Sequence, residues 1–410
     1  MSNTLLTDSV ITREALMLLE NNLKVALRLN RQYDDRFAVS GAKIGNSLDI
    51  RKPARYVGGE GQALSIESIT ETKVTLTLEK QFHVGLQFSA QDLALSIDDF
   101  NKRVLAGPVA TIANKIDYYA TGSYIDVANY TGTPGTVQTT LLSYLQLGEH
   151  LDNESAPQDD TRTMAITPKQ QINIVDQLKG LFQASGALSK QYMTGRMGTA
   201  IGFEWVMDQN MRTHATGQLG GTPLVFGASQ TGSQLITDGW TSAAANRLKK
   251  GDCIEIGSGS TACNAVNPMN YQSIGSTRKF VLTADADSNA SGEATLNIYP
   301  SITTSGAFQT VDAVPADNAA ITVFGHASTY ASKQSPTAMA FHKDFAALGF
   351  ADLPVPGGVD KGARVADDQL GISIRLVRDY TIMDDQFICR LDVLCGRVTQ
   401  YPELCARGQG

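Results

Sequence analysis

The sequence predicts an α+β fold that carries an inserted β-rich, barrel-like domain. Near the N-terminus and again around residues 100–120, hydrophobic residues recur at helical spacing. Between residues 42 and 88, and again near the C-terminus, they alternate with polar residues, which is typical of half-exposed strands. Between residues 220 and 328 the composition shifts to Gly, Ser, Thr, Ala and Asn, with short strand patterns in succession. These three observations define the expected elements.

The composition excludes several classes of protein. The chain has 410 residues, of which 42% are hydrophobic and 18% charged, with a formal net charge of −7. Because proteins that grip nucleic acid usually carry a surplus of Lys and Arg, DNA binding as the main activity is disfavoured. The five cysteines lack C-x-x-C spacing, which predicts neither a disulfide framework nor a zinc site. With no signal-peptide pattern and no membrane-length apolar run, we expect a cytoplasmic protein that does not bind a membrane.

Residues 1–40 are expected to form an N-terminal arm built on an amphipathic helix. Its apolar stripe repeats every four positions, at Ile11, Ala15, Leu19, Leu23 and Leu27. The sequence shows no obvious partner for this stripe within its own domain, so we expect it to dock on a neighbouring subunit. Deletion of residues 5–30 should then spare folding of the monomer and block assembly.

Residues 41–88 are expected to form a long β-ribbon. Apolar and polar residues alternate over Val74–Leu78 and Phe82–Phe88, and the segment Val57–Gly61 interrupts the pattern with glycines. Isolated two-stranded ribbons are marginally stable in water. The ribbon, with its tip at Gly58 and Gly59, is therefore expected to lie along another molecule.

The remaining elements follow in order. Residues 89–129 predict a long helix that starts at Ser89 or Ser96 and is kinked or restarts at Pro108. Residues 130–219 mix short helices and strands, with a helix from Pro168 to Phe182. Residues 220–328 form the inserted β domain, and residues 329–410 close the fold. Six strands are expected after residue 250, at 252–256, 279–283, 294–299, 320–324, 372–376 and 387–394.

The sequence offers weak candidates for chemistry. Gly257–Ala262 resembles a dinucleotide-binding loop, but that loop must open a helix, and the residues that follow favour a turn. Asp285–Asn289 resembles a calcium loop that fails at Ala290 and Leu296, so we interpret it as a hairpin loop. The five histidines are scattered, at positions 83, 150, 214, 326 and 342. We predict no catalytic, cofactor-binding or metal-binding residues, and a protein that is not an enzyme.

Three stretches carry a family resemblance: Leu76–Leu93, Arg247–Ile256, and Phe387–Gly396 with Pro402 and Glu403. Together with the order of the elements, they resemble the Hong Kong ninety-seven capsid fold. The closest likeness is to the phage P22 coat protein family, which carries an insertion domain. In these terms, residues 1–40 correspond to the N-arm, 41–88 to the E-loop, and 89–129 to the spine helix and peripheral domain. Residues 130–219 correspond to the axial domain, 220–328 to the insertion domain, and 329–410 to the axial return and closing peripheral strands.

The resemblance implies the major capsid protein of a tailed double-stranded DNA phage, located in the virion and assembled in the host cytoplasm. Such subunits self-assemble into an icosahedral shell of pentamers and hexamers. The implied partners are further copies of the chain, a scaffolding protein, the portal, and packaged DNA held by weak non-specific contact; no cofactor is implied. The alternatives are an encapsulin-like cargo compartment and a β-rich surface binding protein or hydrolase.

The resemblance also nominates contact residues. In related shells, opposite charges on the insertion domain touch a neighbour across a two-fold axis, which here nominates Arg247, Lys249, Lys250 and Asp252. Acidic groups on the N-arm helix bind the scaffolding protein, which nominates Glu14 and Glu20. Some members of the fold crosslink a lysine to an asparagine. Lys43 and Lys52 lie near the ribbon, but we interpret them as ordinary solvated lysines.

Overall fold

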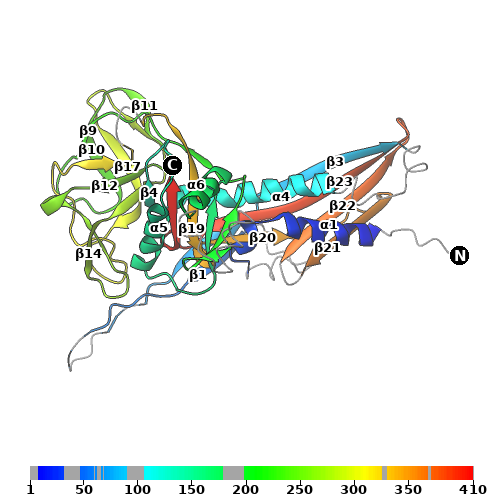
Figure 1. Ribbon diagram of the computed structural model, residues 1–410, viewed down its shortest axis with the longest axis horizontal. Coiled ribbons are helices and arrows are strands. Elements are labelled where there is room, and N and C mark those ends of the chain that lie inside the picture. The colour runs from blue at the N-terminus through cyan, green and yellow to red at the C-terminus, as the bar shows by residue number, and fades with distance from the viewer. Residues whose placement is uncertain are drawn as a thin grey trace. The chain divides into compact units, whose positions relative to one another are not determined.

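The chain forms two compact units in a computed structural model (Figure 1). Unit 1 comprises Met1–Arg51, Lys73–Thr121 and Ala346–Gln400, and unit 2 comprises Lys52–Thr72, Gly122–Phe345 and Tyr401–Gly410. The structure describes residues 8–31, 47–59, 61, 66–67, 69–89, 106–178, 198–325, 330–367 and 371–409. Within these ranges, no helix has the length and apolar character needed to cross a membrane.

Unit 1 is built on a five-stranded antiparallel sheet around a long central strand, β23 (Gln386–Thr399). On one side β23 pairs with β3 (Lys80–Ser89) from the first quarter of the chain. On the other side it pairs first with β22 (Ile372–Thr381) and then with β20 (Ala346–Ala351). The strand β21 (Lys361–Asp367) follows β22 at the edge.

The predicted ribbon over residues 41–88 is correct only in part. Strands β1 (Ser47–Lys52) and β2 (Thr72–Thr77) do form a two-stranded sheet. The predicted continuation through Phe82, Val84 and Leu86 is the strand β3, whose side chains alternate between partly buried and exposed as expected. However, β3 pairs with β23 rather than belonging to the ribbon. Alternation identifies a half-buried face, but it carries no information about which distant strand supplies the hydrogen bonds.

Helices α1 (Asp8–Asn22) and α4 (Ala106–Thr121) both belong to the core of unit 1. Helix α1 packs against α4, β21 and β22 (Figure 1). Its residues Ala15 and Leu19 are fully buried, and the short helix η1 (Ala26–Arg28) follows it. On α4, the buried carboxylate of Asp117 accepts hydrogen bonds from the backbone N–H groups of Lys24 and Ala26, each at 2.9 Å.

This packing corrects the expectation that the N-terminal helix lacks a partner within its own domain. The apolar stripe is covered by α4 and by strands more than 330 residues later in the sequence, which no local pattern reveals. The predicted long helix is confirmed over Ala106–Thr121. Of its two predicted starts, Ser89 is the last residue of the strand β3, and Ser96 lies outside the described residues.

Unit 2 contains a seven-stranded mixed sheet, here called the host sheet. Its order is β4-β24-β19-β5-β7-β6, with β8 paired to the start of β19. Helices α5 (Leu141–Asn153) and α6 (Pro168–Leu178) belong to the same unit. At the start of α6, the side chain of Gln170 accepts a hydrogen bond from the N–H of Thr167 at 3.0 Å. The bounds of its strands are β4 Asn129–Gly132, β5 Arg162–Ile166, β6 Thr199–Ala200, β7 Phe203–Met207, β8 Thr213–Ala215, β19 Gln334–His342 and β24 Cys405–Gln409.

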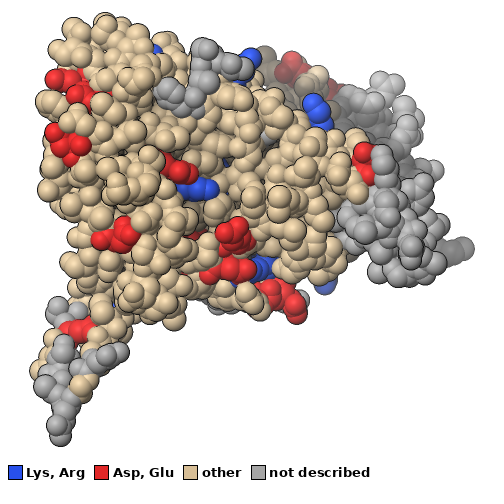
Figure 2. Space-filling model, turned by 60° about the vertical axis from the view of Figure 1, so that its left-hand side comes forward, with Lys and Arg blue, Asp and Glu red and all other residues tan. Residues whose placement is uncertain are grey.

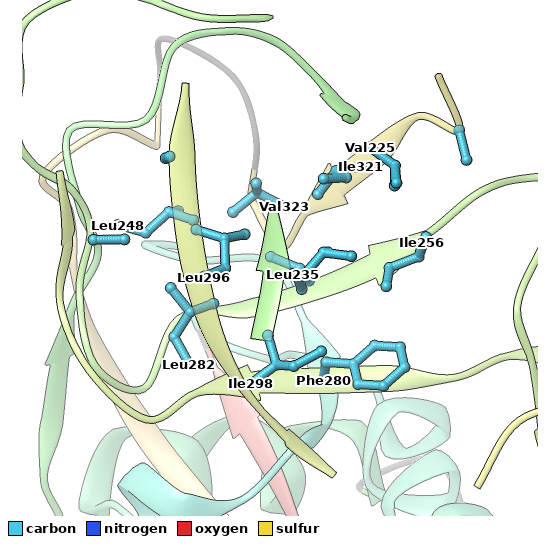
Figure 3. Close-up of a cluster of buried hydrophobic side chains, with 14 of the residues drawn as sticks. Val225, Leu235, Leu248, Ile256, Phe280, Leu282, Leu296, Ile298, Ile321 and Val323 are labelled. Atoms are coloured by element: carbon cyan, nitrogen blue, oxygen red, sulfur yellow. The ribbon is translucent and has the colours of Figure 1, made fainter. Parts of the chain in front are cut away.

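The same unit contains a six-stranded antiparallel sheet, here called the barrel, which confirms that a barrel-like β sheet forms where the sequence predicts one. That it is an inserted domain stays a prediction. Its order is β18-β12-β15-β17-β10-β9. A bridge between Leu224 and Ala320, with Val225 N–H donating to Ala319 O at 2.9 Å, nearly closes it. Buried side chains including Leu235, Phe280 and Leu296 fill its interior (Figure 3). The strands are β9 Gly221–Val225, β10 Gly232–Trp240, β12 Cys253–Ile256, β15 Lys279–Leu282, β17 Ala294–Ile302 and β18 Ile321–Val323.

Shorter elements complete unit 2. Two further strand pairs flank the barrel, β11 (Ala244–Leu248) with β16 (Ala286–Ser288) and β13 (Asn264–Val266) with β14 (Ser273–Thr277). Three-ten helices are η3 Gly122–Asp126, η5 Gly259–Thr261, η6 Lys343–Phe345 and η7 Pro402–Leu404. The glycine-rich segment at 257–262 contains only η5, so it is a turn, as predicted. The predicted hairpin loop at Asp285–Asn289 is instead largely the strand β16.

Candidate functional site

The described residues offer little for catalysis. No group of three or more His, Cys, Asp or Glu side chains among them could hold a metal ion. All five cysteines are buried, and burial raises the pKa of Cys263 to about 11 and that of Cys395 to about 12. On the face drawn in Figure 2, charged side chains form small separate groups rather than one continuous patch.

Arg247, nominated for contact with a neighbour, is buried by the chain's own residues. Its side chain is 5% exposed and donates hydrogen bonds to the carbonyl oxygens of Thr241, at 2.9 Å, and Leu219. It also donates to the hydroxyl of Ser288 at 3.4 Å. Arg247 thus holds together the chain segments around β11, and the sequence reveals its charge but not its burial.

Asp252, the acidic member of the same group, is also internal. One carboxylate oxygen accepts hydrogen bonds from the backbone N–H groups of Lys249, at 2.8 Å, and Gly217, at 3.0 Å. The other lies 2.8 Å from Nε2 of His214. Burial lowers the pKa of His214, so the neutral ring donates Nε2–H to the carboxylate. Asp252 therefore fixes the turn that precedes β12.

Lys249 and Lys250 remain as contact candidates at this turn. Lys249 is partly exposed and Lys250 is exposed. The Nζ of Lys250 lies 4.0 Å from Asp126, and an exposed ion pair of this kind contributes less than about 1 kcal/mol. The turn is rigid, because Asp285 accepts the N–H of Lys250 at 2.7 Å. Contact with a neighbouring subunit stays a prediction for both lysines.

The loop between β1 and β2, here called the ribbon loop, presents Gly58 and Gly59 to solvent. The carboxylate of Glu67 accepts the N–H groups of Gly58, at 2.7 Å, and Val57, at 2.9 Å, and Gly58 has a φ of 76°. Large apolar side chains are exposed in this loop, at Tyr56, Val57, Ile66 and Ile69. The sequence analysis nominated the two glycines as contact residues but not these apolar residues. Their position in and after a glycine-rich break was the signal that could have indicated their exposure.

The two scaffold-binding candidates, Glu14 and Glu20, lie on α1 and are partly exposed. Each also interacts with other residues of the chain. Their role in binding a scaffolding protein stays a prediction. Of the two lysines near the ribbon, Lys43 lies outside the described residues. Lys52 was expected to be an ordinary solvated lysine, but it is partly buried over the ring of Tyr401, and burial lowers its pKa.

The barrel is joined to the host sheet through buried polar pairs, here called the seam. Arg278 of the barrel pairs with Glu154 after α5 at 2.6 Å, and their side chains are 8% and 9% exposed. Lys279 on β15 donates to the carbonyl of Tyr130 at 2.6 Å and to Nε2 of His150 at 2.9 Å. Each interaction joins one residue of the barrel to one of the host. The sequence could not predict these pairs, because the partners are at least 124 residues apart.

The seam continues through two more residues of the host sheet. The hydroxyl of Tyr130 donates to Glu255 on β12 at 2.7 Å, and Lys279 lies 4.3 Å from the centre of the Tyr130 ring. Arg407 on β24 is fully buried and donates to the carbonyl of Gly251 and, at 2.6 Å, to the sulfur of Cys253. The barrel position is therefore fixed by directional contacts as well as by packing.

The seam predicts a loss of stability in acid. Burial, reinforced by the charge of Lys279, lowers the pKa of His150 to about 4. Because the pKa is lower in the folded than in the unfolded state, the contribution of His150 is complete above about pH 6.5 and is lost as the pH falls toward 4. The free energy of unfolding should fall by up to about 3 kcal/mol over that interval because of this residue.

Urea unfolding at pH 7 and pH 5 measures the decrease in the free energy of unfolding that His150 causes. The His150→Gln variant should show a smaller decrease, and an equal decrease in both proteins would contradict the assignment.

Comparisons with known proteins were made for the whole chain. A sequence model of a family described as P22 coat protein, gene protein 5, matches residues 54–408. No curated protein gives a significant match. Among solved structures, one from Mycobacterium phage Che8 is similar with 11% identity and a TM-score of 0.46, covering 94% of this chain and 90% of that one. The capsid of cyanophage P-SCSP1u gives 11% and 0.43, covering 93% and 86%, and the mature capsid of bacteriophage PhiM1 gives 10% and 0.44, covering 93% and 87%.

Proposed function

Because the family model matches residues 54–408, this chain belongs to the P22 coat protein family, and we propose how its elements build a shell. The chain is the major capsid protein of a tailed phage and forms an icosahedral shell. It is a structural component of the virion rather than an enzyme. The family match is the observation that carries this conclusion, since structural similarity at the level found is too low to carry it.

The order of elements supports a finer assignment of parts. The sheet of unit 1 with α4 serves as the peripheral domain and spine helix, and the ribbon loop serves as the E-loop. The host sheet of unit 2 serves as the axial domain, and the barrel serves as the insertion domain. This assignment is supported by long-range strand pairing. The strand β3 follows the chain that leaves the ribbon loop through β2, and it pairs with β23 near the C-terminus.

The exposed residues support a model of assembly into pentamers and hexamers. The ribbon loop offers apolar side chains at a protruding turn, and Lys250 offers a positive charge on a rigid turn. Small separate contacts of this kind suit a subunit that must stay monomeric until assembly begins. A scaffolding protein that binds through Glu14 and Glu20, and a portal, are the further partners proposed. The net charge of −7 suits an inner face that holds packaged DNA only weakly.

The decisive experiment is imaging of the expressed protein. Full-length chain produced in bacteria together with its scaffolding protein should yield closed icosahedral particles in negative stain. Particles from infected cells should contain DNA and a tail vertex, which excludes a cargo compartment of the encapsulin type. Only soluble monomers under all of these conditions would overturn the proposed function.

A further inference from the structure

A pocket of about 510 Å³ lies beside the barrel in unit 2 and combines apolar walls with charged groups. Its apolar lining includes Tyr299, Pro300, Phe308 and Tyr401. Such a lining of rings and prolines suits an apolar side chain from a partner, held by a few polar groups at fixed positions. The charged groups of the pocket then determine which charge a bound apolar segment must carry beside its apolar side chain.

The pocket carries an unbalanced positive charge. Lys52, Arg55 and Arg278 line it, against only two carboxylates, Glu154 and Glu403. Both carboxylates are already paired: Glu154 with Arg278 at 2.6 Å, and Glu403 with Arg55 at 2.9 Å. The third cation therefore has no carboxylate of its own in the pocket.

Lys52 is that cation. Its Nζ lies 4.8 Å from the centre of the Tyr401 ring and makes no hydrogen bond or ion pair with any of the described residues. Burial lowers the pKa of Lys52, and the negative charge of Glu403 offsets part of that decrease. In the same pocket, Nε of the 7% exposed Arg278 has no hydrogen-bond acceptor. Because Arg278 is paired with Glu154, Lys52 is the cation of this pocket that lacks a carboxylate partner, which points to a ligand that carries a carboxylate.

The chain itself presents a segment with this chemistry. The turn between β22 and β23, here called the hairpin tip, carries Ile382 and Met383, which are 83% and 91% exposed. Asp384 and Asp385 follow immediately, and Asp384 is exposed. Asp385 has a φ of 50° and accepts the hydroxyl of Tyr380 at 2.8 Å, which fixes the turn. Exposed apolar side chains of this size usually mark a contact surface.

The ribbon loop is the competing occupant and fits less well. Ile66 is 90% exposed, but its neighbour Glu67 already accepts two backbone N–H groups of the same loop. The hairpin tip combines exposed apolar side chains with the adjacent carboxylate of Asp384, which makes no hydrogen bond or ion pair with the described residues. A second copy of this chain therefore supplies both the apolar and the acidic part that the pocket requires.

We propose that, in the assembled shell, the hairpin tip of one subunit inserts Met383 into this pocket of a neighbouring subunit and pairs Asp384 with Lys52. The proposal rests on the shell function and adds to it a specific contact between copies. It uses a second molecule of the same sequence, so every subunit donates one tip and receives another. A heterologous contact of this kind closes rings when the rotation between copies allows it.

Charge reversal tests the pair. Lys52→Glu and Asp384→Lys are each expected to lower the yield of particles about tenfold, because each replaces an attraction by a repulsion, and the double variant should restore most of it. Asp379→Lys is the matched control. It makes the same charge change as Asp384→Lys on an exposed residue of the same hairpin, and it should assemble normally. Within the part of the chain that the structure describes, the Asp379 carboxylate accepts a hydrogen bond only from the adjacent Tyr380 N–H. Gel filtration of each variant verifies that the monomer is folded.

Chemical crosslinking gives an independent test that does not depend on weakened assembly. Particles of the Met383→Cys/Phe308→Cys variant, treated with a short bismaleimide, should give a ladder of linked subunits on a denaturing gel. Neither single cysteine variant nor the parent chain should give this ladder, because the five cysteines of the parent chain are buried. Normal particles from both charge-reversed single variants, with no ladder from the double cysteine variant, would overturn the contact and leave the shell function intact. Absence of particles from the parent chain would instead overturn the shell function.

Discussion

Deletion of residues 8–29 is expected to abolish the soluble, folded monomer. The deletion removes five large apolar side chains that are each at most 5% exposed, namely Leu16, Leu19, Leu23, Val25 and Leu29. Full burial of such a side chain contributes about 1.5–3 kcal/mol, and a whole domain is stable by only about 5–15 kcal/mol. The deletion also leaves the buried carboxylate of Asp117 without the N–H groups of Lys24 and Ala26. Gel filtration and circular dichroism of the purified variant measure the loss.

A control substitution separates packing from assembly. Met17 lies on the same helix but is 56% exposed, so Met17→Ser should leave the monomer folded. If the deletion variant stays soluble and unfolds at the same urea concentration as the parent chain, then α1 is not part of the core of unit 1. A failure of Met17→Ser to assemble, with a folded monomer, would show that the outer face of α1 contacts another molecule.

Breaking the buried pair of the seam is expected to destabilise unit 2 strongly. The Glu154→Gln variant keeps the volume of the side chain but leaves the guanidinium of Arg278 buried without its carboxylate, which lies 2.6 Å away in the parent chain. Removing one partner of a buried pair typically costs about 3–5 kcal/mol. Urea unfolding of the full chain at pH 7 measures the change. The Arg278→Met/Glu154→Leu double variant should be less destabilised than Glu154→Gln, because it removes both charges together.

An exposed pair between the same two parts provides the matched control. Lys250 of the barrel faces Asp126 of η3 at 4.0 Å, with side chains that are 46% and 40% exposed. Lys250→Ala should therefore change the free energy of unfolding by less than about 1 kcal/mol. Equal effects of Glu154→Gln and Lys250→Ala would show that the pair of Arg278 and Glu154 is not shielded from water in solution.

The sequence by itself determined the elements whose patterns are local. The alternation at Phe82, Val84 and Leu86 specified a half-exposed strand, and the strand at residues 294–299 was predicted within a few residues of β17. These predictions succeeded because the side-chain period of a strand is two residues, and burial of one face imposes that period on the sequence. The family likeness was visible for the same reason, because the order in which these elements follow one another can be read directly from the sequence.

Only the tertiary structure decided which elements meet. The partner of β3 is β23, about 300 residues later, and the stripe on α1 is covered by α4, β21 and β22. Charge at Arg247 and Asp252 was evident from the sequence, but their burial follows from segments around β8 and β9 that fold over them. A one-dimensional pattern records that a face is buried or that a residue is charged. Which distant residues cover that face or pair with that charge depends on the path of the whole chain, and this decides whether a charged side chain serves the core or a neighbouring subunit.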